Sequence, residues 1–215
     1  MVTHANVLAN QRMIAAAFEQ HRGRTCVSWL PLFHDMGLIG VLLQTFLGGG
    51  HCVLMAPEAF LIKPLRWLRA IERYGAQVSG APNFAYDLCA RKIAPQQSET
   101  LDLSGWELAF CGAEPVRAAT MESFAARFAP NGFEARAFYP CYGLAEATLF
   151  VAGGDCNAPP TLARFDAAAL QHHRAQPVAQ GEAREGEARE GANAKTLVGC
   201  GRAWLDGEVY IRPLA

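Results

Sequence analysis

The chain has 215 residues, of which 51% are apolar, with 19 basic and 20 acidic side chains. This near-neutral balance gives no basic surface for nucleic acid or an anionic membrane, and the apolar fraction suffices for a substantial core. The seven cysteines form no C-x-x-C pair, so neither a zinc site nor a disulfide framework is indicated, and free thiols in a reducing cytoplasm are expected. The first 18 residues lack the pattern of a targeting signal, and the most apolar run, 37–50, is too short and Gly-rich to span a membrane, which predicts a soluble protein.

Predicted helices and strands alternate along the first 150 residues. Thr3 can cap a first helix, in which Val7, Ile14 and Phe18 follow at roughly helical spacing. Beyond it, β-branched and aromatic runs predict strands, and apolar periodicity bounded by Gly or Pro predicts helices. The strands are expected at 25–32, 51–55, 77–81, 107–111, 135–139 and 148–152, and the helices at 37–47, 64–74, 84–93 and 116–128. Pro57 is expected to open a loop.

This alternation predicts an α/β fold with a mainly parallel sheet flanked by helices, followed by a small β-rich C-terminal segment. We assign 1–152 to an α/β subdomain that binds the ligands. The composition then changes, and the tandem repeat GEARE-GEARE at 181–190 predicts a low-complexity, flexible loop over 153–195. The runs LVGCG and GEVYI suggest hairpin-like strands in 196–215, a short β segment that begins the next subdomain.

A single carboxylate, Glu146, lies in the otherwise apolar segment YGLAEAT at 142–148. The run 138–141 predicts a buried strand, and the Tyr142-Gly143 step has the residues of a turn that ends it. An acid just beyond a strand lies at the carboxyl edge of the sheet, where open α/β folds bind ligands, and Mg²⁺ takes carboxylate oxygens there together with substrate phosphates. The alternative is a charge or cap at the N-terminus of a following helix.

A second strand-to-helix junction, LPLFHDMGL at 30–38, carries His34 and Asp35. Both polar side chains could face a ligand crevice, with the acid orienting the imidazole as a base. The alternative is that both cap the helix that starts near Gly37. No G-x-S-x-G nucleophile elbow is present, which disfavours a triad hydrolase.

Two further junctions have the same character. In CGAEPV, Gly112 allows close approach of a flat ligand, Pro115 suits the first turn of a helix, and Glu114 can favour the positive end of that helix. The other junction, SGAPNFAYDLC, contributes Gly80, Pro82, Asn83, Phe84 and Tyr86. Each junction alone is a weak signal, but four in one sheet together describe a crevice.

In this order and spacing, LPLFHDMGL, SGAPNFAYDLC, CGAEPV and YGLAEAT resemble the adenylate-forming (AMP-binding, acyl-CoA synthetase-like) superfamily. Within it the chain looks most like the fatty acyl-AMP ligases, which typically have Ala where Ala145 stands and where acyl-CoA ligases usually carry Thr. The resemblance covers 1–150 well and 197–211 loosely.

The resemblance implies a role for each matching residue. Glu146 would help to hold Mg²⁺ on the phosphates of ATP, and Glu146 and His34 would be the catalytic residues. The adenylate or AMP would contact Tyr142, Gly143, Leu144 and Ala145, with Gly112, Ala113, Glu114 and Pro115 lining the adenine pocket. The acyl group would be bordered by His34, Asp35, Pro82, Asn83 and Phe84.

The implied reaction is the attack of a fatty acid carboxylate on the α-phosphorus of ATP, with release of pyrophosphate. The acyl group would then pass to an acyl carrier protein or to a polyketide or non-ribosomal peptide synthase module, in lipid or polyketide biosynthesis. These ligases resemble one another in an insertion after the YGLAEAT motif, thought to hinder use of coenzyme A, but the GEARE repeat departs from it. The family's phosphate loop and adenylation Lys have no counterpart in the sequence, so we expect a central fragment that is inactive alone. The alternatives are a fragment of an acyl-CoA ligase and a non-catalytic, truncated adenylate-binding or interaction module.

Overall fold

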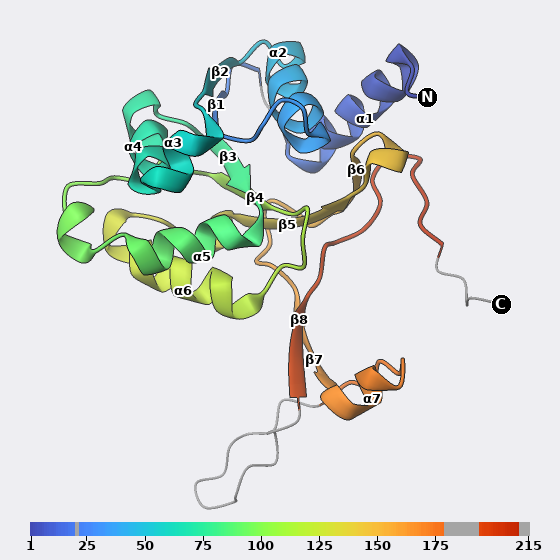
Figure 1. Cartoon of the computed structure of the whole chain (residues 1–215). Coiled ribbons are helices and arrows are strands. Elements are labelled where there is room, and N and C mark those ends of the chain that lie inside the picture. Colours follow the sequence, from blue (N-terminus) through green and yellow to red (C-terminus); the bar gives the residue numbers. More distant parts are fainter. Residues whose placement is uncertain (20–21, 179–193, 211–215) are drawn as a thin grey trace, which may run out of the picture.

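A six-stranded sheet in the order β2-β1-β3-β4-β5-β6 forms the centre of the computed structural model, which describes residues 1–19, 22–178 and 194–210 (Figure 1). The strands are β1 (Thr25–Ser28), β2 (His51–Leu54), β3 (Val78–Ala81), β4 (Leu108–Cys111), β5 (Phe138–Gly143) and β6 (Phe150–Gly153). All pairs from β2 to β5 are parallel, and only β6 runs antiparallel to its neighbour. The predicted α/β class with a mainly parallel sheet is therefore confirmed.

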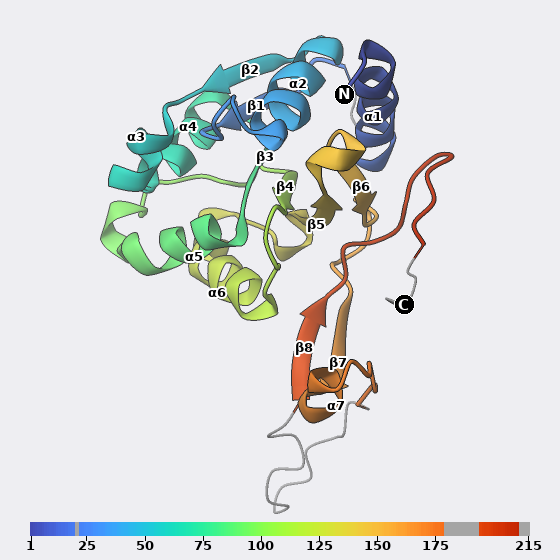
Figure 2. The ribbon, with the colours of Figure 1, turned by 45° about the vertical axis from the view of Figure 1, so that its right-hand side comes forward.

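Helices cover both faces of this sheet. They are α1 (His4–Ala17), the π-helical η1 (Met36–Leu43), α2 (Gln44–Leu47), α3 (Pro57–Ile62), α4 (Leu65–Tyr74), α5 (Asn83–Lys92) and α6 (Ala118–Phe128). Short 3₁₀ turns lie at η2 (Pro95–Gln97), η3 (Ala129–Asn131), η4 (Ala135–Ala137) and η5 (Ala145–Ala147). In Figures 1 and 2, α1, η1 and α2 lie on one side of the sheet, and α5 and α6 lie on the other. No helix in the described part of the chain is long and apolar enough to cross a bilayer.

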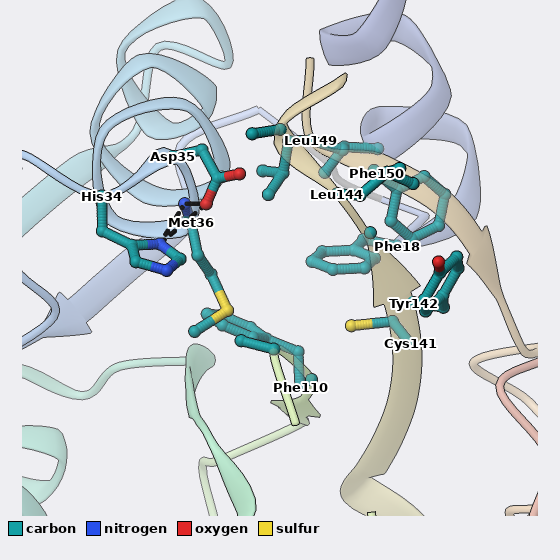
Figure 3. Close-up of a pocket in the computed structure, with 16 residues that line it drawn as sticks. Phe18, His34, Asp35, Met36, Phe110, Cys141, Tyr142, Leu144, Leu149 and Phe150 are labelled. Atoms are coloured by element: carbon teal, nitrogen blue, oxygen red, sulfur yellow. Dashed lines mark hydrogen bonds and ion pairs between the residues drawn. The ribbon is translucent and has the colours of Figure 1, made fainter. Parts of the chain in front are cut away.

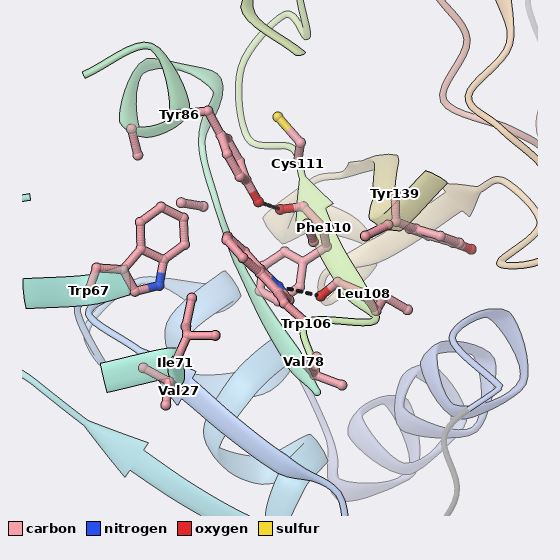
Figure 4. Packing of buried hydrophobic residues seen from close by; sticks show 14 of the residues in the cluster. Val27, Trp67, Ile71, Val78, Tyr86, Trp106, Leu108, Phe110, Cys111 and Tyr139 are labelled. Atoms are coloured by element: carbon pink, nitrogen blue, oxygen red, sulfur yellow. Dashed lines mark hydrogen bonds between the residues drawn. The ribbon is translucent and has the colours of Figure 1, made fainter. Parts of the chain in front are cut away.

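The face covered by α4, α5 and α6 is packed with buried aromatic rings (Figure 4). Tyr86 lies 5.1 Å from both Phe124 and Phe138, and Trp106 lies 5.3 Å from Trp67, between ring centroids. Their polar atoms have partners, as buried groups require. The Tyr86 hydroxyl donates to the Phe110 carbonyl at 2.8 Å, and Trp106 Nε1 donates to the Leu108 carbonyl at 3.0 Å. These bonds orient the two rings against β4.

The opposite face is held to α1 by aromatic contacts and by side-chain hydrogen bonds, among them one from the Tyr139 hydroxyl to the Ala17 carbonyl at 3.0 Å. The Phe18 ring lies 4.8 Å from Tyr139 and 6.0 Å from both Phe110 and Phe150. Asn10, which is 5% exposed, donates through Nδ2 to the Phe150 carbonyl at 2.8 Å and accepts the Phe150 N–H at 3.0 Å. A single side chain therefore pairs with β6 as a neighbouring strand would.

After β6 the chain forms a two-stranded antiparallel arm of β7 (Leu162–Asp166) and β8 (Ala194–Val198), with α7 (Ala167–Gln171) between them. Figures 1 and 2 show this arm extending away from the six-stranded sheet. The expectation of a flexible loop over 153–195 is wrong for β7, which pairs with β8, and for the helix α7 that follows β7. The GEARE repeat lies outside the described residues, and the division into subdomains stays a prediction. Residues 207–210 of the GEVYI run form no strand.

Several predicted boundaries are corrected. The loop expected at Pro57 is the helix α3, in which Pro57 occupies the first turn, where its missing N–H costs nothing. Residues 135–137, predicted as strand, form the 3₁₀ turn η4. The first strand ends at Ser28, four residues early.

Candidate functional site

A cavity of about 280 Å³ lies at the carboxyl ends of β4 and β5, beside η1 and α1. Its wall is mostly apolar, and Figure 3 shows His34, Asp35 and Met36 across from Phe18, Cys141 and Tyr142. Eight of the predicted site residues line it: His34, Asp35, Gly112, Ala113, Tyr142, Gly143, Leu144 and Ala145. Three of the four strand-end motifs therefore meet at one hollow, as the parallel topology requires.

The His34–Asp35 pair serves both of the alternatives that the sequence leaves open. Asp35 Oδ1 accepts the Met36 N–H at 2.7 Å and so caps η1, while both residues line the cavity. His34 Nδ1 lies 2.7 Å from the same Asp35 oxygen, and the carboxylate can only accept, so Nδ1 carries a proton and donates it. Because a protonated Nδ1 cannot accept a hydrogen bond, the Met36 N–H donates to Asp35. The Met36 nitrogen also lies 3.2 Å from His34 Nδ1.

The helix η1, which starts within the LPLFHDMGL motif, has the wide π geometry that often occurs at functional sites. Gln11 of α1 donates through Nε2 to the Ile39 carbonyl at 2.7 Å, which adds a partner to this carbonyl within the widened turns. A Cβ at Gly37 would overlap the Pro31 carbonyl, so this glycine permits η1 to start directly above the preceding loop. The arrangement fixes Asp35 and Met36 at the rim of the cavity.

Two glycines bring backbone close to backbone on the opposite wall. A Cβ at Gly112 would lie 3.0 Å from the Cys141 carbonyl oxygen, and a Cβ at Gly143 would overlap the Leu149 carbonyl. The turn predicted at Tyr142-Gly143 does not occur at these residues, because β5 continues through Gly143 and pairs with β6. The chain reverses after Gly143, where the Leu144 N–H donates to the Leu149 carbonyl at 2.8 Å.

Glu146 lies in that reversal, within the three-residue turn η5. Its side chain is exposed and makes no hydrogen bond or ion pair with another described residue, and the cavity is lined by Leu144 and Ala145 beside it. The alternative of a charge at the start of a helix holds only for η5, a three-residue 3₁₀ helix with Glu146 in its first turn, and the next element is the strand β6. Within the described residues no three His, Cys, Asp or Glu side chains gather as a protein-only metal cage. A single free carboxylate still fits Mg²⁺, which commonly takes one or two carboxylates and completes its shell with substrate phosphates and water.

Besides Glu146, five predicted site residues do not line the cavity: Pro82, Asn83, Phe84, Glu114 and Pro115. For Glu114 the sequence left open a place in the adenine pocket or at the positive end of the following helix; its Oε1 instead accepts the N–H of Phe84 at 2.6 Å and so caps α5. Pro115 lies in the loop before α6 and not in its first turn, since the helix begins at Ala118. The Glu114 and Asn83 side chains connect the segments that follow β3 and β4.

The cavity also contains Met36, which lies in the LPLFHDMGL motif but was not predicted as a site residue, and residues outside every motif: Ile14, Phe18, Gly40, Phe110, Cys141, Leu149 and Phe150. They come from α1, η1, β4, β5 and β6 and its preceding turn, so no local spacing connects them. Burial raises the pKa of the Cys141 thiol to about 12, which keeps it neutral and makes it part of the apolar wall.

Comparison with known proteins gives relatives over nearly the whole chain. A medium-chain-fatty-acid–[acyl-carrier-protein] ligase, TtuA, from Teredinibacter turnerae is 45% identical over 94% of this chain and 30% of its own length. The crystal structure of a fatty acid AMP ligase from Legionella pneumophila superposes with a TM-score of 0.87 at 42% identity, over 94% of this chain and 34% of that one. A fatty acyl-adenylate ligase from the same organism, in complex with acyl adenylate and pyrophosphate, gives a TM-score of 0.86 with the same identity and coverage. The chain thus spans about a third of the length of these relatives.

The family description "AMP-binding enzyme" matches residues 1–187, which include all four strand-end motifs and the whole cavity. The chain therefore belongs to the AMP-binding enzyme family.

Proposed function

We propose that the chain is part of a fatty acyl-AMP ligase, which activates a fatty acid with ATP and passes the acyl group to an acyl carrier protein. One observation carries the proposal: a cavity with apolar walls ends at the glycine-containing carboxyl edges of two parallel strands. Apolar walls favour an alkyl chain by about 0.8 kcal/mol for each buried methylene group. Exposed backbone at strand ends favours a flat base and its phosphate. An acyl-adenylate has both parts, and a Legionella relative was solved with one bound.

The roles of the residues follow from this ligand. Gly112 and Ala113 border the base, while Tyr142, Gly143, Leu144 and Ala145 contact the nucleotide. His34 lies beside the carboxylate that reacts, with its ring orientation fixed by Asp35 at 2.7 Å. The carboxylate oxygen forms a bond to the α-phosphorus of ATP as the bond from that phosphorus to the pyrophosphate oxygen breaks. Holding both reactants together in one cavity supplies most of what such a step needs.

Glu146 would hold Mg²⁺ through its exposed carboxylate, together with the phosphates of the nucleotide. When bound, the ion neutralises the negative charge of the phosphates and of the departing pyrophosphate. Glu146 has no described partner that must first be released, and η5 holds it just beyond the cavity wall. A cytoplasmic location is also part of the proposal, supported by seven cysteines that are all free.

The test is fatty-acid-dependent release of pyrophosphate by the full-length ligase, with Glu146→Ala as the main variant. We expect a loss of about 100-fold or more in kcat, the usual effect of removing one group that stabilises transition-state charge. Glu122→Ala is the matched control, because Glu122 is an exposed carboxylate on α6 that does not line the cavity. Equal release by the two variants would refute the role of Glu146.

The same assay separates the other candidates. Release of AMP that requires coenzyme A, in place of an acyl carrier protein, would indicate an acyl-CoA ligase. Absence of detectable binding of a non-hydrolysable acyl-adenylate analogue in calorimetry would indicate a non-catalytic protein.

A further inference from the structure

The loops that follow β3 and β4 are connected by reciprocal bonds from side chain to backbone. Glu114, from the loop after β4, accepts the N–H of Phe84 in the first turn of α5 at 2.6 Å. Asn83, from the first turn of α5, accepts the N–H of Arg117 at the start of α6 at 2.9 Å. Asn83 Nδ2 also donates to the Thr120 hydroxyl of α6 at 3.2 Å. The N-terminus of α5 therefore receives a hydrogen bond from the loop before α6, and the N-terminus of α6 receives one from the first residue of α5.

The local sequence explains why these bonds form between loops. The residue before α5 is Pro82, and the residue before α6 is Arg117; neither provides a side-chain cap to its own helix. The first N–H groups of a helix have no partner within it and need an external acceptor. A carboxylate is the strongest such acceptor, and it also interacts favourably with the positive end of the helix dipole. Asn83 is 5% exposed, so its amide has little access to water as an alternative partner.

The connection links the cavity to the segment that the family resemblance places beside the acyl group. Gly112 and Ala113, immediately before Glu114, line the cavity, and Ala113 has a φ of 65°, a strained value for a residue with a side chain. On the α5 side, the Phe84 ring lies 6.0 Å from the ring of Trp29, the residue that follows β1. Movement of one loop therefore requires movement of the other.

We propose that Glu114 and Asn83 are positioning residues that lock the nucleotide side of the cavity to the start of α5. The lock keeps the two ligand halves at one fixed separation while the carboxylate approaches the phosphorus. Neither residue needs to touch the ligands, which agrees with their absence from the cavity wall. The consequence for catalysis rests on the proposed function, whereas the lock itself does not.

The lock is tested first by NMR on the 215-residue chain. An amide proton that is bound to a carboxylate changes its chemical shift as the carboxyl group titrates. We expect the chemical shift of the Phe84 amide proton to change with pH in the wild-type chain and to lose this response in Glu114→Gln. A Phe84 amide that does not respond to pH in the wild-type chain would overturn the proposal.

The second test is kinetic and uses the full-length ligase. We expect Glu114→Ala and Asn83→Ala each to lower kcat about tenfold with KM for ATP changed less than about twofold, because positioning acts on the reacting geometry. The double variant should lose little more than either single one, and Glu114→Gln, which keeps an acceptor oxygen, should recover most of the rate. Glu72→Ala is the control, because Glu72 accepts the backbone N–H of Asp102 at 2.9 Å away from the cavity.

The outcomes are distinguishable. An unchanged kcat in Glu114→Ala, or a loss equal to that of Glu72→Ala, would overturn the catalytic part of the proposal. A wild-type ligase without adenylating activity would refute the proposed function, while the NMR titration would still decide whether the lock exists. If Asn83→Ala fails to fold, Asn83→Asp, which keeps the acceptor for Arg117, replaces it and should retain more activity than Glu114→Ala.

Discussion

Ser79 provides the most sensitive test of how β1 and β3 are held together at the centre of the sheet. Its side chain is fully buried, and its hydroxyl donates to the Val27 carbonyl of β1 at 2.6 Å while accepting the indole N–H of Trp67 at 2.8 Å. The backbones of β1 and β3 pair at one position only, Cys26 with Val78. The serine hydroxyl therefore extends a short ladder at the centre of the sheet.

The substitution Ser79→Ala removes one oxygen atom and leaves two buried polar groups without a partner. Val27 and Trp67 are 1% and 0% exposed, so water cannot replace the hydroxyl. An unsatisfied buried group costs about 1–3 kcal/mol, so we expect the free energy of unfolding to fall by about 2–4 kcal/mol. For a chain of this length that corresponds to a decrease in Tm of roughly 4–16 °C.

The measurement is urea denaturation of the 215-residue chain followed by tryptophan fluorescence. The midpoint should fall while the slope m stays constant, which reports a change in stability alone. Ser123→Ala is the matched control, because Ser123 is exposed on α6 and should stay within about 0.5 kcal/mol of wild type. A loss below about 1 kcal/mol for Ser79→Ala, or a loss equal to that of the control, would refute this account of the β1–β3 junction.

Two further predictions concern the opposite face and the buried thiols. Asn10→Ala should lower the free energy of unfolding by about 2–3 kcal/mol, because both hydrogen bonds of Asn10 to Phe150 are lost. The rate of amide hydrogen exchange should rise in β6 before it rises in β4. An equal rise in both strands would contradict the role of Asn10 in holding β6. Burial raises the pKa of Cys26 from 9.0 to about 12, so the thiol stays protonated in the folded chain after it ionises in the unfolded one. Stability should therefore fall as pH rises from 9 toward 12, and Cys26→Ala should reduce this slope by up to about 1.4 kcal/mol per pH unit. An unchanged slope in urea titrations at pH 8 to 10.5 would exclude Cys26 as a contributor.

The sequence by itself determined the fold class and the edge of the sheet at which the site lies. Alternating strands and helices with Gly or Pro at their ends can form only a mainly parallel sheet, and parallel strands bring their carboxyl ends to one edge. Eight predicted residues, among them His34, Gly112 and Tyr142, line the same cavity for this reason. The burial of Cys26 in β1 and Cys111 in β4 likewise agrees with their apolar runs, whereas Cys52 in β2 is only half-buried.

Only the tertiary structure decided where helices and strands begin and end, and which partner each polar side chain binds. Pro57 begins a helix because Phe60 packs against the Trp29 ring at 4.1 Å, a contact between segments far apart in sequence. The arm of β7 and β8 depends on pairing between segments separated by about 30 residues, which no local pattern reports.

Glu114 and Glu146 illustrate the limit most directly. Both are acids just past a strand, and spacing alone assigns each to a helix end or to a ligand. In the folded chain Glu114 caps a neighbouring helix at 2.6 Å, whereas Glu146 remains exposed in a turn without a described partner. The identity of a carboxylate follows from the sequence, but its partner is set by which backbone N–H groups the packing of other elements leaves within reach.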